Sequence, residues 1–334
     1  MASTTPPPSD LVCTSYWSTA PHRSELRTAP LRHPEAGEAL VRTLFSGISR
    51  GTEMLVHRGV VPPRVAHLMR APFQEGEFPF PVKYGYLSVG VVEEGPTSLV
   101  GKRVFCLHPH QDLYVVPEDA LTLIPDDVPS ERAVLAGAVE TAINALWDCS
   151  PRIGDRIAVV GGGIIGASVA ALLSGFPLAR LQLVDTDPSK QRVASAMGIE
   201  WVHPDDAISE CDIVYHASAT EEGLADGLAQ LGDEGELVEL SWYGTDSPSV
   251  PLGLDFHARR LRILGSQVGT IAASRRARRT HEDRMELVMS ALADPRFDAL
   301  LDGISPFADL PTVMEDMSRG ALPGMLQLIS YTTS

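Results

Sequence analysis

The chain has 334 residues, of which 44% are hydrophobic and 21% are charged, as in a globular protein large enough for two domains with substantial cores. Its formal net charge of −16 would repel nucleic-acid phosphates, so we expect no nucleic-acid partner. The four cysteines are widely separated and form no C-x-x-C pair, which argues against a zinc knuckle and a disulfide framework. No apolar run approaches membrane-spanning length, and we expect a cytoplasmic protein with no membrane association.

The first part of the chain is expected to be rich in β-strands. Short alternating apolar runs lie between Gly and Pro residues, a pattern typical of strands joined by turns. The clearest runs are residues 38–45, 87–93, 103–107 and 113–116. A predicted helix over residues 130–149 then leads into a second part with a different pattern.

The second part begins with a strand, a glycine turn and a helix. Residues 157–160 form a short apolar run typical of a buried parallel strand, and residues 164–173 are apolar and small enough to form a helix packed on a sheet. The residues between them contain the motif G-x-G-x-x-G. Glycines let the backbone approach a pyrophosphate closely, and the helix N-terminus supplies N–H groups and a partial positive charge. We therefore expect a dinucleotide to contact Gly161, Gly163, Ile164, Ile165 and Gly166.

An acidic residue supports this interpretation. Asp185 ends a second predicted strand, residues 181–185, about 20 positions after Gly166. This spacing suits a carboxylate that accepts hydrogen bonds from the adenosine ribose. Thr186 and Asp187 add no positive charge for a 2′-phosphate, so the sequence favours NAD(H) over NADP(H). The alternative is a structural strand–turn–helix unit that binds no ligand.

Strands and helices alternate from there to the end of the chain. The expected helices are residues 188–197, 223–231 and 281–293, and the expected strands are residues 211–216, 236–242, 262–266 and 325–331. This alternation predicts an α/β fold with a doubly wound parallel sheet, in which helices cover both faces. The last helix and the last strand would return to complete the first domain.

Several stretches distributed along the chain carry a family resemblance. Besides the glycine motif, they are residues 37–42 (GEALVR), 46–53 (SGISRGTE), 85–92 (GYLSVGVV) and 101–105 (GKRVF). Together they resemble the medium-chain dehydrogenase/reductase superfamily, which has the zinc alcohol dehydrogenase fold. Within it, SGISRGTE with GYLSVG is similar to the bacteriochlorophyllide dehydrogenase branch. The resemblance implies a β-rich, GroES-like catalytic domain (residues 1–140 and 272–334) and a Rossmann domain (residues 141–271).

The residues at the family's zinc positions depart from its pattern. Zinc-binding members carry Cys, His-Glu and a third ligand where this chain has Ser49, Tyr86 with the following leucine, and Gly137. A catalytic zinc needs about three ligands from Cys, His, Asp or Glu, so we expect a zinc-free protein with no bound metal. His108 and His110 could share one face of an extended segment. They lack a third ligand, however, and a packed or solvated pair is the preferred interpretation.

Hydride transfer without a metal still needs a group that gives or takes a proton. By the resemblance, the candidates are Tyr86 and Ser49 in the vacated metal pocket, Glu140 as a base, His110 as the group that best titrates near neutral pH, and Thr141 as a nicotinamide contact. Each has a structural alternative: Tyr86 fills the vacated space, Ser49 bonds its own loop, and Glu140 pairs with an arginine such as Arg50. We expect Arg50 and Glu53 to brace their loop as an ion pair.

These observations predict an NAD(H)-dependent oxidoreductase that interconverts an alcohol and a carbonyl on a small molecule, in specialised metabolism. One alternative is a quinone or enoyl reductase, which delivers hydride to a conjugated double bond and more often uses NADPH. Another is a catalytically degenerate protein that only binds NAD(H).

The sequence also suggests how the chain assembles. Residues 261–269 form an apolar final strand, and an exposed edge of this kind invites pairing. The resemblance implies a homodimer through this edge; the alternative is a monomer whose edge is covered by the next segment. That segment contains the basic cluster of residues 275–279. A solvated helix start is the preferred interpretation of the cluster, and a clamp for an anionic substrate or the cofactor pyrophosphate is the alternative.

Overall fold

A computed structural model of the chain describes residues 11–331. The chain forms two compact units. One consists of the described residues of Met1–Val134 and Gly303–Ser334, and the other of Leu135–Asp302. We call the first the discontinuous unit and the second the continuous unit.

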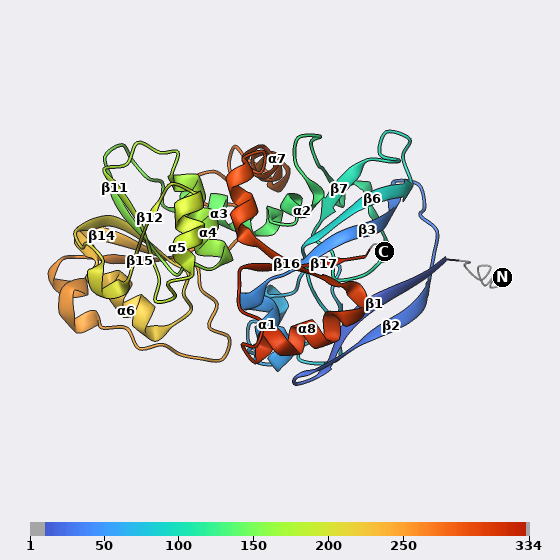
Figure 1. The fold of residues 1–334 in the computed structure, drawn as a ribbon, viewed down its shortest axis with the longest axis horizontal. Coiled ribbons are helices and arrows are strands. Elements are labelled where there is room, and N and C mark those ends of the chain that lie inside the picture. The colour runs from blue at the N-terminus through green and yellow to red at the C-terminus, as the bar shows by residue number, and fades with distance from the viewer. Residues whose placement is uncertain (1–10, 332–334) are drawn as a thin grey trace. The chain divides into compact units, whose positions relative to one another are not determined.

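The continuous unit contains a six-stranded sheet in the order β12-β11-β10-β13-β14-β15, with every neighbouring pair parallel (Figure 1). Its strands are β10 (Arg156–Val160), β11 (Arg180–Val184), β12 (Glu200–Val202), β13 (Cys211–His216), β14 (Leu231–Glu239) and β15 (Arg262–Gly265). Its α-helices are α3 (Ala136–Asp148), α4 (Ile164–Leu173), α5 (Lys190–Ala196), α6 (Glu221–Ala229) and α7 (His281–Ala291). The strand order reverses between β10 and β13, which is the switch point of a doubly wound sheet. The predicted α/β architecture is confirmed.

The core of this unit explains why its strands were visible in the sequence. Val160, Val184, Val214 and Leu237 come from four adjacent strands and belong to one buried cluster. When helices cover both faces of a parallel sheet, its central strands have no solvent-facing side and become continuous apolar runs. Such runs are short and easily distinguished from the longer helices between them.

The discontinuous unit contains two sheets. One has the order β2-β1-β5-β4, and the other the order β16-β17-β3-β6-β7-β9, with β8 also paired to β3. The strands are β1 (Leu11–Ala20), β2 (Arg23–Leu31), β3 (Glu38–Ile48), β4 (Glu75–Gly76), β5 (Val82–Lys83), β6 (Ser88–Glu94), β7 (Arg103–Cys106), β8 (Leu113–Pro117), β9 (Thr122–Leu123), β16 (Leu301–Pro306) and β17 (Leu326–Ser330). The α-helices are α1 (Arg50–Arg58), α2 (Ser130–Ala133) and α8 (Leu310–Ser318).

A buried cluster joins distant parts of the sequence within the discontinuous unit. Ile48 at the end of β3, Met54 on α1, Met314 on α8 and Ile329 on β17 pack together with Tyr16 of β1. The C-terminal strand β17 pairs antiparallel with β3. The end of the chain thus completes the sheet that begins near residue 38, and it holds the β3–α1 junction in place.

The second passage of the chain between the units lies later than the resemblance implied. We expected the boundary at residue 272, whereas the continuous unit extends to Asp302. The reason is that α7 packs on α3 within this unit. Arg284 of α7 is 1% exposed and donates to Glu140 of α3. A buried guanidinium without such a partner would be costly, so α7 remains with the helix that carries its partner.

Two other predicted elements differ in extent. The helix expected over residues 130–149 is divided into α2 and α3, and the break falls at Val134 and Leu135, where the chain passes from one unit to the other. The strand expected to begin at residue 236 begins at Leu231. Within residues 11–331, no helix combines the length and the apolar character needed to cross a bilayer.

The glycine turn allows a matched pair of substitutions. A Cβ on Gly166 would lie 1.9 Å from the carbonyl oxygen of Gly161, whereas a Cβ on Gly163 would meet no atom within 4 Å. We expect Gly166→Ala to lower the free energy of unfolding by about 1–3 kcal/mol or more, because the backbone must move apart. Gly163→Ala should lower it by less, about 0.5–1 kcal/mol, because no atom is displaced and the cost is that of a poorer N-cap residue. Urea unfolding measures both, and equal midpoints would contradict the close approach.

Candidate functional site

The G-x-G-x-x-G segment forms a tight turn from β10 into α4. Gly161 adopts φ +100°, and a Cβ on it would lie 2.6 Å from the backbone nitrogen of Ser218. Gly163 is the N-cap residue of α4. The first N–H groups of an α-helix have no acceptor within the helix, so those of Ile164 and Ile165 can donate to an anion at this end. The turn has the open backbone that a pyrophosphate requires.

Asp185 lies directly beside this turn. One of its carboxylate oxygens accepts from the backbone N–H of Gly162 at 2.6 Å, and the other accepts from the backbone N–H of Asp187 at 2.8 Å. The residue follows β11 and is half-buried. The structure therefore brings the acidic residue and the glycines together, and the contact of Asp185 with a ribose stays a prediction.

A lysine that the sequence analysis overlooked also lies here. The Cβ and Cγ atoms of Lys190 would each be 3.2 Å from a Cβ on Gly162, and its Nζ lies 3.6 Å from Oδ2 of Asp187. Lys190 begins α5, three residues after Asp187, which is a spacing that brings side chains together. The turn is thus bordered by a cation as well as by carboxylates, and both bear on which cofactor it prefers.

Glu53 and His110 form a buried pair in the discontinuous unit. Nε2 of His110 lies 2.8 Å from Oε2 of Glu53, and the two side chains are 1% and 2% exposed. Nδ1 of His110 lies 2.7 Å from Oγ of Ser46, which is 3.0 Å from Oη of Tyr331. Gly85 adopts φ +126°, and a Cβ on it would lie 2.9 Å from Cδ2 of His110. The imidazole is therefore held at both nitrogens, and only glycine fits beside it.

Ser49 and Tyr86 adjoin this pair. Ser49 is the N-cap residue of α1, and its backbone N–H donates to Oε1 of Glu53 at 2.8 Å. Burial raises the pKa of Tyr86 to about 12, and Glu53 adds to the rise. The side chains of Ser49 and Thr52 oppose that rise. The phenol of Tyr86 is thus protonated at neutral pH. The structure brings three candidates, Ser49, Tyr86 and His110, together around Glu53.

Glu140 and Thr141 belong to the continuous unit. Oε1 of Glu140 accepts from Nε of Arg284 at 3.1 Å and from Nη2 at 2.7 Å. Burial raises the pKa of Glu140, and Arg284 opposes the rise. The hydroxyl of Thr141 donates to a carbonyl of its own helix at 2.9 Å. Glu140 thus pairs with an arginine, as the alternative held, but the partner is Arg284 and not Arg50. Glu53, which we expected to pair with Arg50, accepts from His110.

His108 is directed away from this group. Its ring stacks on Tyr114 with a centroid separation of 3.8 Å and on Phe73 at 5.6 Å. Burial lowers the pKa of His108 to about 3. His108 and His110 are both buried, but they have different partners. Within the described part of the chain, the one group of three His, Cys, Asp or Glu side chains close enough to share a metal ion consists of His22, His57 and Glu315.

A second polar cluster that the sequence analysis missed lies at the carboxyl ends of β13 and β14. Nδ1 of the fully buried His216 lies 2.9 Å from both carboxylate oxygens of Glu239, and Nε2 lies 2.7 Å from Oγ of Ser218. Burial raises the pKa of Glu239, but His216 and the hydrogen bonds from Ser241 together more than reverse the rise, and the pKa lies below its ordinary value. Ligands of doubly wound sheets bind outside the carboxyl ends of the strands, at the switch point. The cluster therefore borders the expected cofactor site.

Both residues of this pair could have been noticed, because each is a polar residue that ends an apolar strand. His216 is the last residue of β13 and Glu239 is the last residue of β14. The two strands are parallel neighbours in which His216 lies opposite Glu239. Adjacent parallel strands bring their carboxyl ends to one edge of the sheet, so the pair follows from the predicted topology.

No family model matches the sequence, but several curated proteins do. The chain is 23% identical over 328 residues to 2-dehydro-3-deoxy-L-galactonate 5-dehydrogenase of Pseudoalteromonas atlantica, across 89% of this chain and 92% of that protein. It is 29% identical over 276 residues to 2-desacetyl-2-hydroxyethyl bacteriochlorophyllide A dehydrogenase of Rhodobacter capsulatus, across 74% and 79% respectively. A zinc-type alcohol dehydrogenase-like protein of Haemophilus influenzae is 25% identical over 225 residues, and that match spans 62% of this chain and 60% of that protein.

Solved structures match nearly the whole chain. An alcohol dehydrogenase of Escherichia coli CFT073 complexed with NADH has a TM-score of 0.75 and 16% identity, across 96% of this chain and 99% of that one. A dehydrogenase of Sinorhizobium meliloti 1021 bound to NADP has a TM-score of 0.76 and 16% identity, across 96% and 100%. At these identities the likeness shows the fold alone. The combination of a Rossmann unit with a GroES-like unit, as predicted, is confirmed.

Proposed function

We propose, on the premise that the chain belongs to the medium-chain dehydrogenase/reductase superfamily, that it is an oxidoreductase which interconverts an alcohol and a carbonyl on a small molecule without a catalytic zinc. The relatives named above are dehydrogenases, which supports this reaction class. The observation that carries the zinc-free mechanism is the group around Glu53. Tyr86 and Ser49 stand where the family resemblance expects metal ligands, and the phenol of Tyr86 is protonated at neutral pH.

The residues of this chain would divide the work as follows. A bound nicotinamide supplies or accepts the hydride. The turn from Gly161 to Gly166 and the N-terminus of α4 would hold the pyrophosphate, and Asp185 would accept from the ribose. In the reducing direction Tyr86 would donate the proton that the carbonyl oxygen takes up. The Glu53–His110 pair would position α1 and the residues that precede it.

A matched pair of tyrosine variants tests this function. In an NADH oxidation assay with a panel of ketones and aldehydes, Tyr86→Phe should lower kcat by about 10²–10⁴-fold, the usual contribution of a positioned proton donor. Cofactor affinity should not change. Tyr84→Phe is the control, because Tyr84 packs against Tyr86 and its hydroxyl donates to the carbonyl of Met69.

Full turnover in Tyr86→Phe would remove Tyr86 from the mechanism. Turnover restricted to conjugated enones would favour a quinone or enoyl reductase. Tight NADH binding with no turnover over the whole panel would favour a degenerate protein that only binds the cofactor.

We propose NAD(H) as the preferred cofactor. The solved structures that share this fold hold either NADH or NADP, so the fold does not decide between them. Asp185 would accept from the ribose hydroxyls and repel a 2′-phosphate, and Lys190 would oppose that repulsion. We regard the carboxylate as dominant, because it lies directly on the glycine turn.

Calorimetry on single variants tests this preference by comparing the affinities for NADH and NADPH. The unmodified protein should bind NADH at least about tenfold more tightly than NADPH. Asp185→Ser should narrow the difference, because it removes the ribose acceptor and the repulsion together. Lys190→Ala is the matched variant and should widen it. Equal affinities for the two cofactors in the unmodified protein would refute the NAD(H) preference.

We also propose that the protein is a homodimer paired along β15. This strand is the last in its sheet, and Ile263 and Leu264 are 40% and 37% exposed. An exposed apolar edge favours pairing with another strand. The basic cluster of residues 275–279, for which we preferred a solvated helix start, lies in the turn before α7 and not in the first turn of that helix. Most of its arginines are exposed.

Light scattering at micromolar concentration tests the assembly. We expect about twice the chain mass, and Ile263→Pro should shift the protein toward monomer because proline removes a backbone donor from the edge. A mass near the 35.9 kDa of one chain would reject the dimer.

A further inference from the structure

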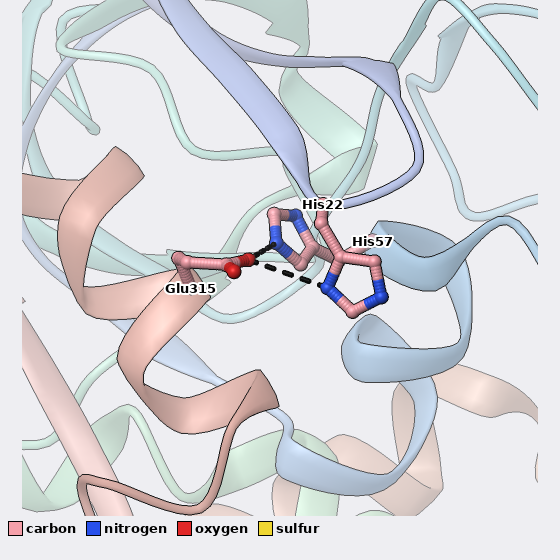
Figure 2. Close-up of side chains that lie close together, drawn as sticks. All are labelled: His22, His57 and Glu315. Carbon is pink, nitrogen blue, oxygen red and sulfur yellow. Dashed lines mark hydrogen bonds and ion pairs between the residues drawn. The ribbon is translucent and has the colours of Figure 1, made fainter.

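Three polar side chains from distant parts of the sequence converge in the discontinuous unit. Figure 2 shows the imidazoles of His22 and His57 facing the carboxylate of Glu315. His22 lies in the turn between β1 and β2, His57 in the last turn of α1, and Glu315 on α8. Oε2 of Glu315 lies 3.1 Å from Nε2 of His57 and 3.3 Å from Nδ1 of His22.

We propose that these three residues form a binding site for a divalent transition metal of the zinc class, with water as a further ligand. Two imidazoles and one carboxylate are a ligand set that zinc uses in proteins, with metal–ligand distances of about 2.0–2.2 Å. Ligands arranged tetrahedrally at that distance lie roughly 3.3 Å from one another. The two separations that involve Glu315, 3.1 Å and 3.3 Å, lie close to this value, and all three ligand atoms lie within 4.8 Å of one another.

Neighbouring groups orient these ligands. Nδ1 of His57 lies 3.3 Å from the hydroxyl of Tyr16, so a proton on Nδ1 can be donated to Tyr16 while Nε2 keeps its lone pair for a metal. Nε of Arg319 lies 2.6 Å from Oε1 of Glu315 and leaves Oε2 to act as a single ligand. Partners of this kind fix the tautomer and orientation of metal ligands. The positive charge of Arg319 also weakens the site, so we expect micromolar affinity.

The turn between β1 and β2 fixes the place of His22. His22 adopts φ +59°, a left-handed turn conformation that histidine, like asparagine and aspartate, enters more readily than most residues other than glycine. Its backbone N–H donates to the carbonyl of His57 at 3.0 Å. The turn aims an imidazole at Glu315 from a position where glycine would fit the backbone with less strain.

Exposure gives an ion a route to the site. The side chain of His57 is 0% exposed, that of Glu315 is 20% exposed and that of His22 is 48% exposed. A metal would therefore enter from the His22 side, where water completes its coordination. The ion would tie the β1–β2 turn to α1 and α8. This assignment replaces our expectation that the chain binds no metal, and it leaves the zinc-free mechanism around Tyr86 untouched.

The competing explanation is a hydrogen-bonded network in which Glu315 accepts from both imidazoles. Zinc chloride titration of the untagged, chelator-treated protein, followed by calorimetry and by thermal unfolding, separates the two. We expect one zinc per chain and a rise in Tm of a few degrees, because the ion binds the folded state alone. No saturable binding below millimolar zinc would overturn the site.

Two ligand variants and one control locate any bound zinc. His22→Asn, which suits the turn conformation, and Glu315→Gln should each weaken zinc binding at least about tenfold. His33→Asn is the control, since His33 also faces a carboxylate, Glu94, on the surface of the same unit. Binding that survives both ligand variants would overturn the assignment.

Turnover measured before and after chelation keeps this proposal separate from the proposed function. We expect turnover to be unchanged. If His22→Asn abolished zinc binding while chelation also abolished turnover, the metal site would stand and the zinc-free mechanism would fail. If zinc did not bind and turnover were unaffected by chelation, the metal site would fail and the zinc-free mechanism would stand.

Discussion

The close approach of α4 to the end of β10 is the constraint on which the cofactor half of the structure depends. A side chain on Gly166 would collide with the carbonyl of Gly161, and one on Gly161 would collide with the backbone of Ser218. Asp185 reaches the same turn from the neighbouring strand by accepting from Gly162. Because β11 and β13 flank β10 on opposite sides, one bare turn meets the carboxylate of Asp185 from one neighbour and the backbone of Ser218 from the other. The site is assembled around backbone, which only glycine leaves exposed.

This half could be predicted because its determinants are local. The strand, the glycines, the helix and Asp185 lie within about 30 residues, the usual length of such a unit. Parallel strands covered on both faces are continuous apolar runs, and β13 was expected at the residues where it occurs. Three residues escaped notice. Lys190 begins the helix that follows Asp185, and His216 and Glu239 end the next two strands on the other side of β10. These residues follow from topology and not from the motif itself.

The site in the discontinuous unit could be anticipated only in part. The family resemblance brought Ser49, Tyr86 and His110 into consideration, but the residue that links them, Glu53, was assigned to a different partner. Glu53 and His110 are 57 residues apart, and Ser46 and Tyr331 are 285 apart. Such pairs are set by the tertiary packing of segments that are distant in the sequence, and no sequence period connects them. The His22–His57–Glu315 cluster, whose last two members are 258 residues apart, was invisible for the same reason.

The group around Glu53 also constrains the kind of chemistry that can replace a metal. A metal ion stabilises a developing alkoxide by its charge, whereas a neutral phenol offers only a hydrogen bond and a proton. Glu53 contributes to the high pKa of Tyr86, so this environment disfavours negative charge on the phenol. The same field would disfavour an alkoxide held beside it. Donation of a proton from Tyr86 to the substrate oxygen leaves a phenolate, which burial and Glu53 disfavour. Tyr86 must therefore regain a proton from water as the transfer occurs, so that neither an alkoxide nor a phenolate stays in the pocket.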